Sequence, residues 1–346
     1  MALGGYEFFA IVGFLFAAYA VIANDSIQTL GTFLASNAHR PWWLLWIYAG
    51  GIMVAALLYQ LYLGGGDIAD GKLNRIPYPE TGIKWWHAVP PLVLLFLTRF
   101  GIPVSTTFLV LTVFALSGGG ATEGVMQSML IKSAIGYLVA FAAGAVIWLL
   151  ISRIWEVWVG RTGIGEKRHP LWTVFQWSTT AFLWWTWLLQ DFANIFVFLP
   201  RTPVFAEDGT VAMMVFEPGL IIFGAVVMAA MMGYVFAVRG GTIQQIVLSK
   251  THTVDVRAAT LVDLIYAIVL FYFKELNDVP MSTTWVFLGL LAGRELAISF
   301  VTDLRERGAA ALDVGSDAGR ALIGLAISVV LAIAMPWLAT GAMPNF

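Results

Sequence analysis

Hydrophobic residues gather into long apolar stretches that are separated by short polar segments. A transmembrane helix needs about 20 predominantly apolar residues. Four stretches meet that requirement without interruption, at residues 43–63, 128–151, 214–238 and 319–340. Each of them is predicted to form a helix that crosses a membrane.

Four other apolar stretches contain polar residues or proline near their middle. They are 6–36, broken at Asn24-Asp25; 84–117, broken between Thr98 and Pro103; 171–199, broken at Gln190-Asp191; and 258–293, broken between Lys274 and Pro280. Polar loops are predicted at 64–83, 152–170, 200–212, 239–257 and 294–318. These four stretches are predicted to be interrupted helices.

Composition supports a membrane protein. Hydrophobic residues make up 60% of the chain, charged residues 12%, and the mean hydropathy is +0.82. Soluble domains carry about 25% charged residues, so we expect the lipid bilayer to be the solvent. A net charge of −2 gives no basic surface, so no nucleic-acid partner is expected. The absence of cysteine excludes disulfides and thiolate metal sites.

The interrupted stretches recur as matched pairs. Asn24-Asp25-x-x-Gln28 parallels Gln190-Asp191-x-x-Asn194, with asparagine and glutamine exchanged. The sequence Pro-x-Ser-Thr-Thr occurs at 103–107 and again at 280–284, and the KSAIG sequence at 132–136 parallels RALIG at 320–324. The three pairs follow the same order in both halves, which indicates an internal duplication.

The topology of the duplication follows from segment length and charge. The arms 84–97 and 105–117 are short for a full crossing at 1.5 Å per residue. If each Ser-Thr-Thr segment instead forms a re-entrant hairpin, the two halves are inverted. This arrangement puts all basic residues outside the apolar stretches on one face, except Lys72, Arg75, Lys84 and Arg201. Cytoplasmic loops are rich in Lys and Arg, so inverted repeats are favoured over parallel ones.

The predicted fold is therefore an all-α polytopic membrane protein built from two inverted repeats. Each repeat has three membrane crossings, one of them interrupted, and a re-entrant helical hairpin. The first repeat is predicted at 1–151, a cytoplasmic linker at 152–170, and the second repeat at 171–346. The prediction places both termini outside, in a multi-pass protein of the plasma (inner) membrane.

The Ser-Thr-Thr segments fit an anion site. Proline suits the first turn of a helix, and Ser or Thr suits its N-cap. Each segment would begin a half-helix whose free N–H groups and hydroxyls point into the protein, where the helix dipole adds partial positive charge. In transporters built from inverted repeats, such ends hold anionic substrates near the bilayer midplane. The simpler alternative is that each is an ordinary capped helix start.

The two aspartates, Asp25 and Asp191, fit a cation site. A carboxylate deep in an apolar segment costs about 3 kcal/mol or more and is usually functional. Sodium takes oxygen ligands, which these carboxylates and the neighbouring amides would supply. The same carboxylates could instead be protonated in turn, or could serve only as helix caps. Gln28 and Asn194 keep an amide on the same helix face as each aspartate, which favours cation binding.

At these residues the chain resembles the inorganic phosphate transporter (PiT) family. That family has a duplicated Asn-Asp-x-x-Asn-type signature and a duplicated Pro-x-Ser-Thr-Thr motif in inverted halves. The resemblance implies sodium- or proton-coupled symport of phosphate with no cofactor, and some relatives similar in fold carry sulfate. It implies that the anion is bound by Ser105, Thr106, Thr107, Ser282, Thr283 and Thr284. It implies that the cation is bound by Asn24, Asp25, Gln28, Gln190, Asp191 and Asn194, with Asp25 and Asp191 as the Na+ ligands.

The sequence departs from that family pattern at several positions. Phe108 and Trp285 follow the two Ser-Thr-Thr segments, where the family often has histidine, and Ile22 stands at the position of a family glycine. Aromatic residues there could shrink or dry the pocket, which favours another oxyanion such as sulfate.

The same residues bear on three other possible functions. An anion channel could use the same half-helix ends, but two buried aspartates have no use beside a pure anion filter. No nucleophile–base pair occurs, so no enzyme is predicted. The Arg-rich loop 294–320 could dock to a larger complex, and the sequence is compatible with a homo-oligomer.

Overall fold

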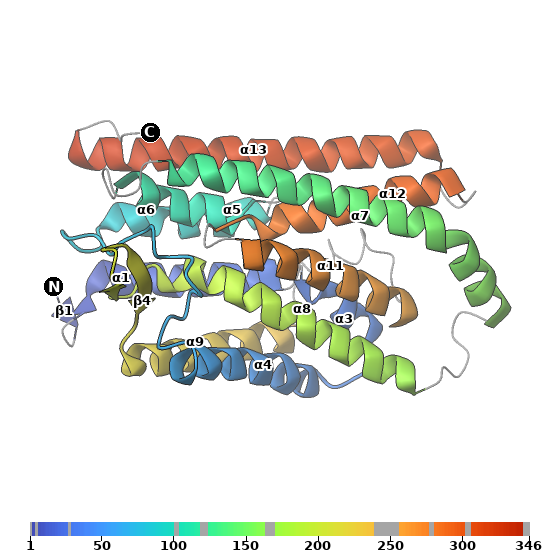
Figure 1. Ribbon diagram of the computed structural model, residues 1–346, viewed down its shortest axis with the longest axis horizontal. Helices are drawn as coiled ribbons and strands as arrows, with labels where there is room; N and C mark the ends of the chain where they lie inside the picture. Colours follow the sequence, from blue (N-terminus) through green and yellow to red (C-terminus); the bar gives the residue numbers. More distant parts are fainter. Residues whose placement is uncertain are drawn as a thin grey trace.

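A computed structural model describes most of the chain. It covers residues 2–3, 6–26, 29–99, 104–117, 124–162, 170–238, 256–276, 280–301 and 306–341. The molecule is an elongated helical bundle in which α13 and α7 extend along most of the long axis (Figure 1).

Helices form almost all of the first half. They are α1 (Phe8–Ala20), a π-helical turn η1 (Val21–Ser26), α3 (Gly31–Ser36), α4 (Trp42–Tyr62), a 3-10 turn η2 (Trp85–Ala88), α5 (Val89–Arg99), a second π-helical turn η3 (Thr107–Leu111), α6 (Thr112–Ser117) and α7 (Val125–Thr162). A short antiparallel pair, β1 (Ala2–Leu3) and β2 (Tyr6–Glu7), precedes them, with Ala2 opposite Glu7.

The second half is also mainly helical. It contains α8 (Leu171–Phe196), α9 (Pro218–Ala237), α11 (Val256–Leu276), α12 (Thr283–Val301) and α13 (Arg307–Thr340). Between α8 and α9, β3 (Thr202–Phe205) and β4 (Val211–Val215) form an antiparallel hairpin with Thr202 opposite Val215.

The lengths and composition of the helices fit a bilayer. In the described part of the chain, seven helices are long and apolar enough to cross a membrane, and they include the four predicted from uninterrupted stretches. The helix α8 is as long but more polar, and most of its second half is buried inside the bundle. The prediction of a multi-pass, mainly helical membrane protein is confirmed.

Two helical hairpins enter the bundle from opposite ends. The α5–α6 pair occupies one half of the long axis and α11–α12 the other, and their tips meet near the middle (Figure 1). The helix α1 begins, and α13 ends, at the same end of the molecule. The re-entrant nature of the hairpins and the side of the bilayer on which the termini lie stay predictions.

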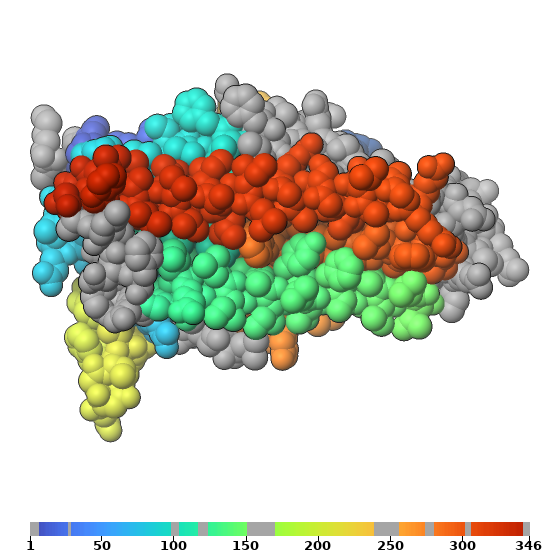
Figure 2. All heavy atoms as spheres, turned by 90° about the horizontal axis from the view of Figure 1, so that it is seen from above, coloured from blue at the N-terminus to red at the C-terminus, as the bar shows by residue number. Residues whose placement is uncertain are grey.

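The second arm of each hairpin packs against the last helix of the other half. α12 lies along α7, and α6 with η3 lies against α13. α4 packs against α9, its expected counterpart. Figure 2 shows α13 and α7 side by side along one face. This exchange is what two related repeats would produce, while the inverted symmetry and the repeat boundaries stay predictions.

Four local predictions need correction. The predicted loop 294–318 is mostly helical, because α12 continues to Val301 and α13 begins at Arg307. α8 runs without a break from Leu171 to Phe196, through Gln190 and Asp191. The second half of this helix is buried inside the bundle, so no helical turn has to open for these two polar side chains to be buried. α7 continues to Thr162, so much of the predicted linker 152–170 is helical. The predicted loop 200–212 contains the β3–β4 hairpin, whose turn uses Gly209 at a φ of 82°. That hairpin projects beyond the helices (Figure 2).

The loop between α4 and η2 is tied to the end of α8 by a buried arginine. The Arg201 guanidinium donates to the Ile76 carbonyl at 2.6 Å and to the Val197 carbonyl at 2.8 Å, and it lies 5.7 Å from the Tyr78 ring centroid. Because burial disfavours its charge, the pKa of Arg201 is lowered to about 9. The loop therefore forms a fixed cap over this end of the bundle.

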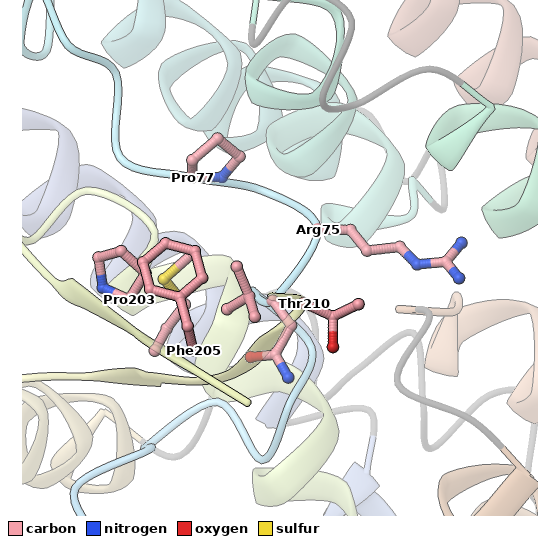
Figure 3. A pocket seen from close by; sticks show the side chains of 8 residues that line it. Arg75, Pro77, Pro203, Phe205 and Thr210 are labelled. Atoms are coloured by element: carbon pink, nitrogen blue, oxygen red, sulfur yellow. The ribbon is translucent and has the colours of Figure 1, made fainter. Parts of the chain in front are cut away.

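A surface cavity lies between this cap and the β3–β4 hairpin. It has a volume of about 480 Å³, and Asn74, Arg75, Pro77, Pro203 and Phe205 are among its lining residues. In Figure 3, Phe205 and Pro203 appear at one side of the cavity, while the Arg75 guanidinium points away from them. Asn74 donates to the Ala212 carbonyl at 2.9 Å, which joins the cap to the hairpin.

We expect the cap to lose stability as pH rises from about 4 to about 6. The buried Asp67 carboxylate accepts the Ala69 and Gly71 N–H groups at 3.1 and 3.0 Å, yet burial raises its pKa from 3.8 to about 6. In the opened loop the carboxyl ionises at lower pH, so opening becomes easier across this interval and then levels off. Amide hydrogen exchange of residues 64–84, corrected for the intrinsic exchange rates at each pH, measures how readily the loop opens. Asp67→Asn should remove the dependence, and an unchanged profile in that variant would contradict the assignment.

Candidate functional site

Both Ser-Thr-Thr segments begin helices, and their serines cap those helices in the same way. We call residues 105–107 the first tip and residues 282–284 the second tip. The Ser105 hydroxyl accepts the Phe108 N–H at 3.3 Å, and the Ser282 hydroxyl accepts the Trp285 N–H at 3.1 Å. A side-chain oxygen that binds the N–H three residues later is the usual N-cap. The repeat in the sequence is therefore a repeat in local structure.

The two tips touch each other in the middle of the bundle. The Thr107 hydroxyl donates to the Met281 carbonyl at 3.2 Å, and the Phe108 and Trp285 rings pack edge to face at 5.6 Å between centroids. All six tip residues are buried, at 4% exposure or less. The site is thus enclosed, with the two helix starts facing one another.

The first aspartate lies on the π-helical turn η1 and is bound to the first tip. Asp25 accepts a hydrogen bond from the Thr106 hydroxyl, and its other oxygen accepts from the Asn24 amide at 2.5 Å. π-helical turns occur frequently at functional sites because they re-aim side chains. Here the extra residue in the turn places Asn24 and Asp25 in the interior together.

Several buried oxygen atoms, on the second aspartate and on its neighbours, accept no hydrogen bond from any described residue. Asn194 donates to Asp191 Oδ1 at 2.6 Å and also lies 3.2 Å from the Thr107 hydroxyl. Among the described residues, Asp191 Oδ2, Asn194 Oδ1 and Gln190 Oε1 are buried without a hydrogen-bond partner. Buried acceptors are normally paired. Carboxylate and amide oxygens left in this way are the ligand type that an alkali cation takes.

The two aspartates lie close enough to interact electrostatically, and Thr283 of the second tip lies beside Asp191. Asp25 with Thr106, and Asp191 with Thr283, are therefore corresponding pairs. The structure brings together the predicted site residues that it describes, with two exceptions: Gln190, which precedes Asp191 in the sequence, is buried but makes no side-chain hydrogen bond to a described residue, and Thr284 is buried at the second tip. Gln28, like Pro103 of the first motif, lies outside the described residues.

Two further residues in the site escaped the sequence analysis. The Ser133 hydroxyl on α7 accepts the Ser282 N–H at 2.8 Å, so a helix of the first half holds the second tip. The Tyr266 hydroxyl on α11 donates to the Thr283 carbonyl at 3.0 Å and lies near both aspartates. Ser133 lies inside the repeated KSAIG segment, where the other half has Ala321, and this difference was the available signal.

The chemistry available is binding by neutral donors next to negative charge. Hydroxyls and helix N-termini can hold an oxyanion without a formal positive charge. The described residues contain no group of three or more His, Cys, Asp or Glu that could hold a metal ion. Asp191, Asn194 and Gln190 are the residues whose oxygens could hold a monovalent cation.

Comparison with known proteins shows a fold that this chain shares with a solved structure. No protein-family model and no curated protein sequence matches the chain. A solved structure described as "The sodium-dependent phosphate transporter" is similar with a TM-score of 0.57, covering 97% of this chain and 98% of that chain at 16% sequence identity. The likeness extends over nearly the whole of both chains, so the two share one architecture.

Proposed function

We propose that this chain is a secondary active transporter that carries inorganic phosphate, or a similar small oxyanion, together with sodium or protons. The observation that carries the proposal is the meeting of two capped helix starts with two aspartates in the middle of the bundle. A multi-pass fold shared with a sodium-dependent phosphate transporter supports it. The fold alone does not select the anion, so the site has to carry that step.

The tips supply what an oxyanion needs. Ser105 and Ser282 occupy the N-caps, and the threonine hydroxyls stand beside them. N–H groups and hydroxyls bind anions, and without a fixed positive charge they also allow release. A transported substrate must be held and then let go, which favours this neutral donor set.

The aspartates explain why a cation would travel with the anion. An oxyanion beside Asp25 and Asp191 is repelled, and two unit charges 4 Å apart interact by about 4 kcal/mol at a dielectric constant near 20. Cations bound by the unpartnered oxygens near Asp191 would remove this repulsion. Each ion then raises the affinity for the other, which is the thermodynamic basis of coupled transport.

Sulfate is the second candidate because of the aromatic pair at the tips. Phe108 is buried and Trp285 is half-buried where they contact each other, and they bring no acceptor to the anion. Phosphate carries a proton at neutral pH and benefits from an acceptor, whereas sulfate carries none. This pair therefore favours sulfate, whereas the similar solved structure is described as a phosphate transporter.

Uptake into proteoliposomes tests the proposal. Radiolabelled phosphate and sulfate would be offered separately under an inward sodium gradient, an inward proton gradient, or neither, with protein-free vesicles as the control. Gradient-driven accumulation of phosphate is the expected result, and accumulation of sulfate alone would select the second candidate. If correctly inserted protein moves neither anion under either gradient, the proposal is wrong.

A further inference from the structure

A third buried carboxylate lies away from the two tips. Asp263 is in the middle of α11, inside the apolar window Val256–Phe273, and is 1% exposed. The Thr32 hydroxyl donates to its Oδ1 and the Thr180 hydroxyl to its Oδ2, both at 2.5 Å. It has no counterpart among the paired motifs of the two halves.

The partners of Asp263 connect it to both aspartate-bearing helical segments. Thr32 is on α3, seven residues after Asp25, and Thr180 is on α8, eleven residues before Asp191. α11 itself leads into the second tip. Asp263 therefore fastens the first arm of the second hairpin to one segment from each half.

No cationic side chain neutralises this carboxylate among the described residues. α3 carries no ionisable group, α8 carries Asp191, and α4 contributes Tyr48, which interacts with Asp263 electrostatically. Charged residues on the other helices that pack against α11 are Lys132 in the first third of α7, and Arg294 and Glu295 on α12. The last third of α7 also contains Arg153, Glu156 and Arg161, while α11 itself carries Arg257 near its beginning and Lys274 and Glu275 near its end. In the part of the chain that the structure describes, Asp263 is bound by the two threonine hydroxyls and interacts electrostatically with Tyr48.

An ionised carboxylate in this position would be costly, so a bound cation or a proton is required. The surroundings differ from those of Asp191, where three oxygens lack partners. Both oxygens of Asp263 are already bound by hydroxyls, and among the described residues neither is a buried atom without a hydrogen-bond partner. A hydroxyl can donate or accept, so Thr32 and Thr180 can bind either the acid or its anion.

We propose that Asp263 is a proton-binding site of the carrier. With α11 docked on Thr32 and Thr180, Asp263 is the neutral acid. When α11 separates from α3 and α8, water reaches the carboxyl, the O–H bond breaks and the proton passes to water. The movement of the second hairpin is then linked to proton binding, in addition to any cation bound near Asp191.

Infrared spectroscopy of the purified full chain tests this without requiring transport. The C=O stretching band of protonated carboxylic acids would be followed between about pH 5 and pH 9, the range around neutrality where a buried carboxyl can titrate. The wild type should lose a band component as pH rises, and Asp263→Asn should lack that component. Identical difference spectra for the two proteins would overturn the proposal.

The threonines give a test that does not depend on the Asp263 variant folding. Thr180→Val removes a donor that favours the ionised form, so the titration should move to higher pH, while Thr180→Ser should restore it. Thr179→Val is the matched control, because the Thr179 hydroxyl binds the Gln176 carbonyl at 3.1 Å and not Asp263. An equal midpoint in all three variants would contradict the assignment.

Sodium is the competing occupant, and the same sample distinguishes it. If added sodium at constant pH removes the Asp263 component, Asp263 binds sodium and the proton proposal is wrong. If sodium leaves the component unchanged, the proton assignment is supported. The result does not depend on which anion is carried, so it stands apart from the uptake experiment.

Discussion

Asp191→Asn is expected to reduce sodium-driven anion uptake by about 10- to 100-fold, which corresponds to the 1.5–3 kcal/mol of a lost interaction with a charged group. Asp191 carries a buried oxygen without a protein partner, next to further unpartnered oxygens of Asn194 and Gln190. The variant replaces one carboxylate oxygen with an N–H donor and removes the charge. Both changes weaken cation binding, and the anion then loses the partner that offsets repulsion by Asp25.

The paired substitution Asp25→Asn should have a similar effect on uptake with an added cost in stability. Both oxygens of Asp25 already accept hydrogen bonds, from Thr106 and Asn24. An asparagine can accept only one of them, so one buried donor loses its partner at a cost of about 1–3 kcal/mol. Thermal unfolding should therefore separate the two variants even if their uptake is equal.

Asp208→Asn is the matched control for both substitutions. Asp208 lies in the exposed turn of the β3–β4 hairpin, where its carboxylate binds Thr210. The same chemical change there should leave uptake unchanged. Initial rates at a series of sodium concentrations measure all three variants. Wild-type sodium dependence in Asp25→Asn and Asp191→Asn would show that neither carboxylate binds the coupling ion.

Gly293→Ala and Gly289→Ala are expected to destabilise the protein by about 1–3 kcal/mol or more, through overpacking of two helices. A Cβ at Gly293 would lie 2.0 Å from the Phe141 carbonyl oxygen, and one at Gly289 would lie 2.3 Å from the Tyr137 carbonyl oxygen. Both oxygens belong to the backbone of α7, which cannot move aside as a side chain can. α12 and α7 would have to separate.

Separating α12 from α7 should also reduce transport. α7 supplies Ser133, which holds the N–H of Ser282, so moving α12 displaces the second tip. Small residues spaced four apart allow close helix packing in membranes, and Gly289 and Gly293 have this spacing.

Gly51→Ala is the control for this pair, because a Cβ at Gly51 on α4 meets nothing within 4 Å. Alanine there should be neutral or slightly stabilising, since it favours the helix by about 1 kcal/mol. Tryptophan fluorescence during heating in detergent measures the apparent melting temperature. If Gly293→Ala melts with the wild type, α7 and α12 have more room than these distances indicate.

Sequence alone predicted the membrane class and most of the helices, and it indicated the residues of the candidate site. Lipid offers no hydrogen bonds to the backbone, so apolar segments of about 20 residues must become helices. Polar residues inside such segments are expensive and therefore informative, as Asp25 and Asp191 were. The repeated Ser-Thr-Thr segments indicated two helix starts because N-capping is local chemistry.

Tertiary packing sets which polar residues interrupt a helix and which atoms face one another. Asn24-Asp25 lies on a π-helical turn, whereas Gln190-Asp191 lies on a continuous helix, although the two sequences are alike. Ser133, Tyr266 and Asp263 meet residues that are distant in the sequence, and no local pattern identifies their partners. A buried polar group is stabilised by whatever donor or acceptor the fold brings within about 3 Å. That choice is made by the packing of helices against each other, which segment hydrophobicity does not encode.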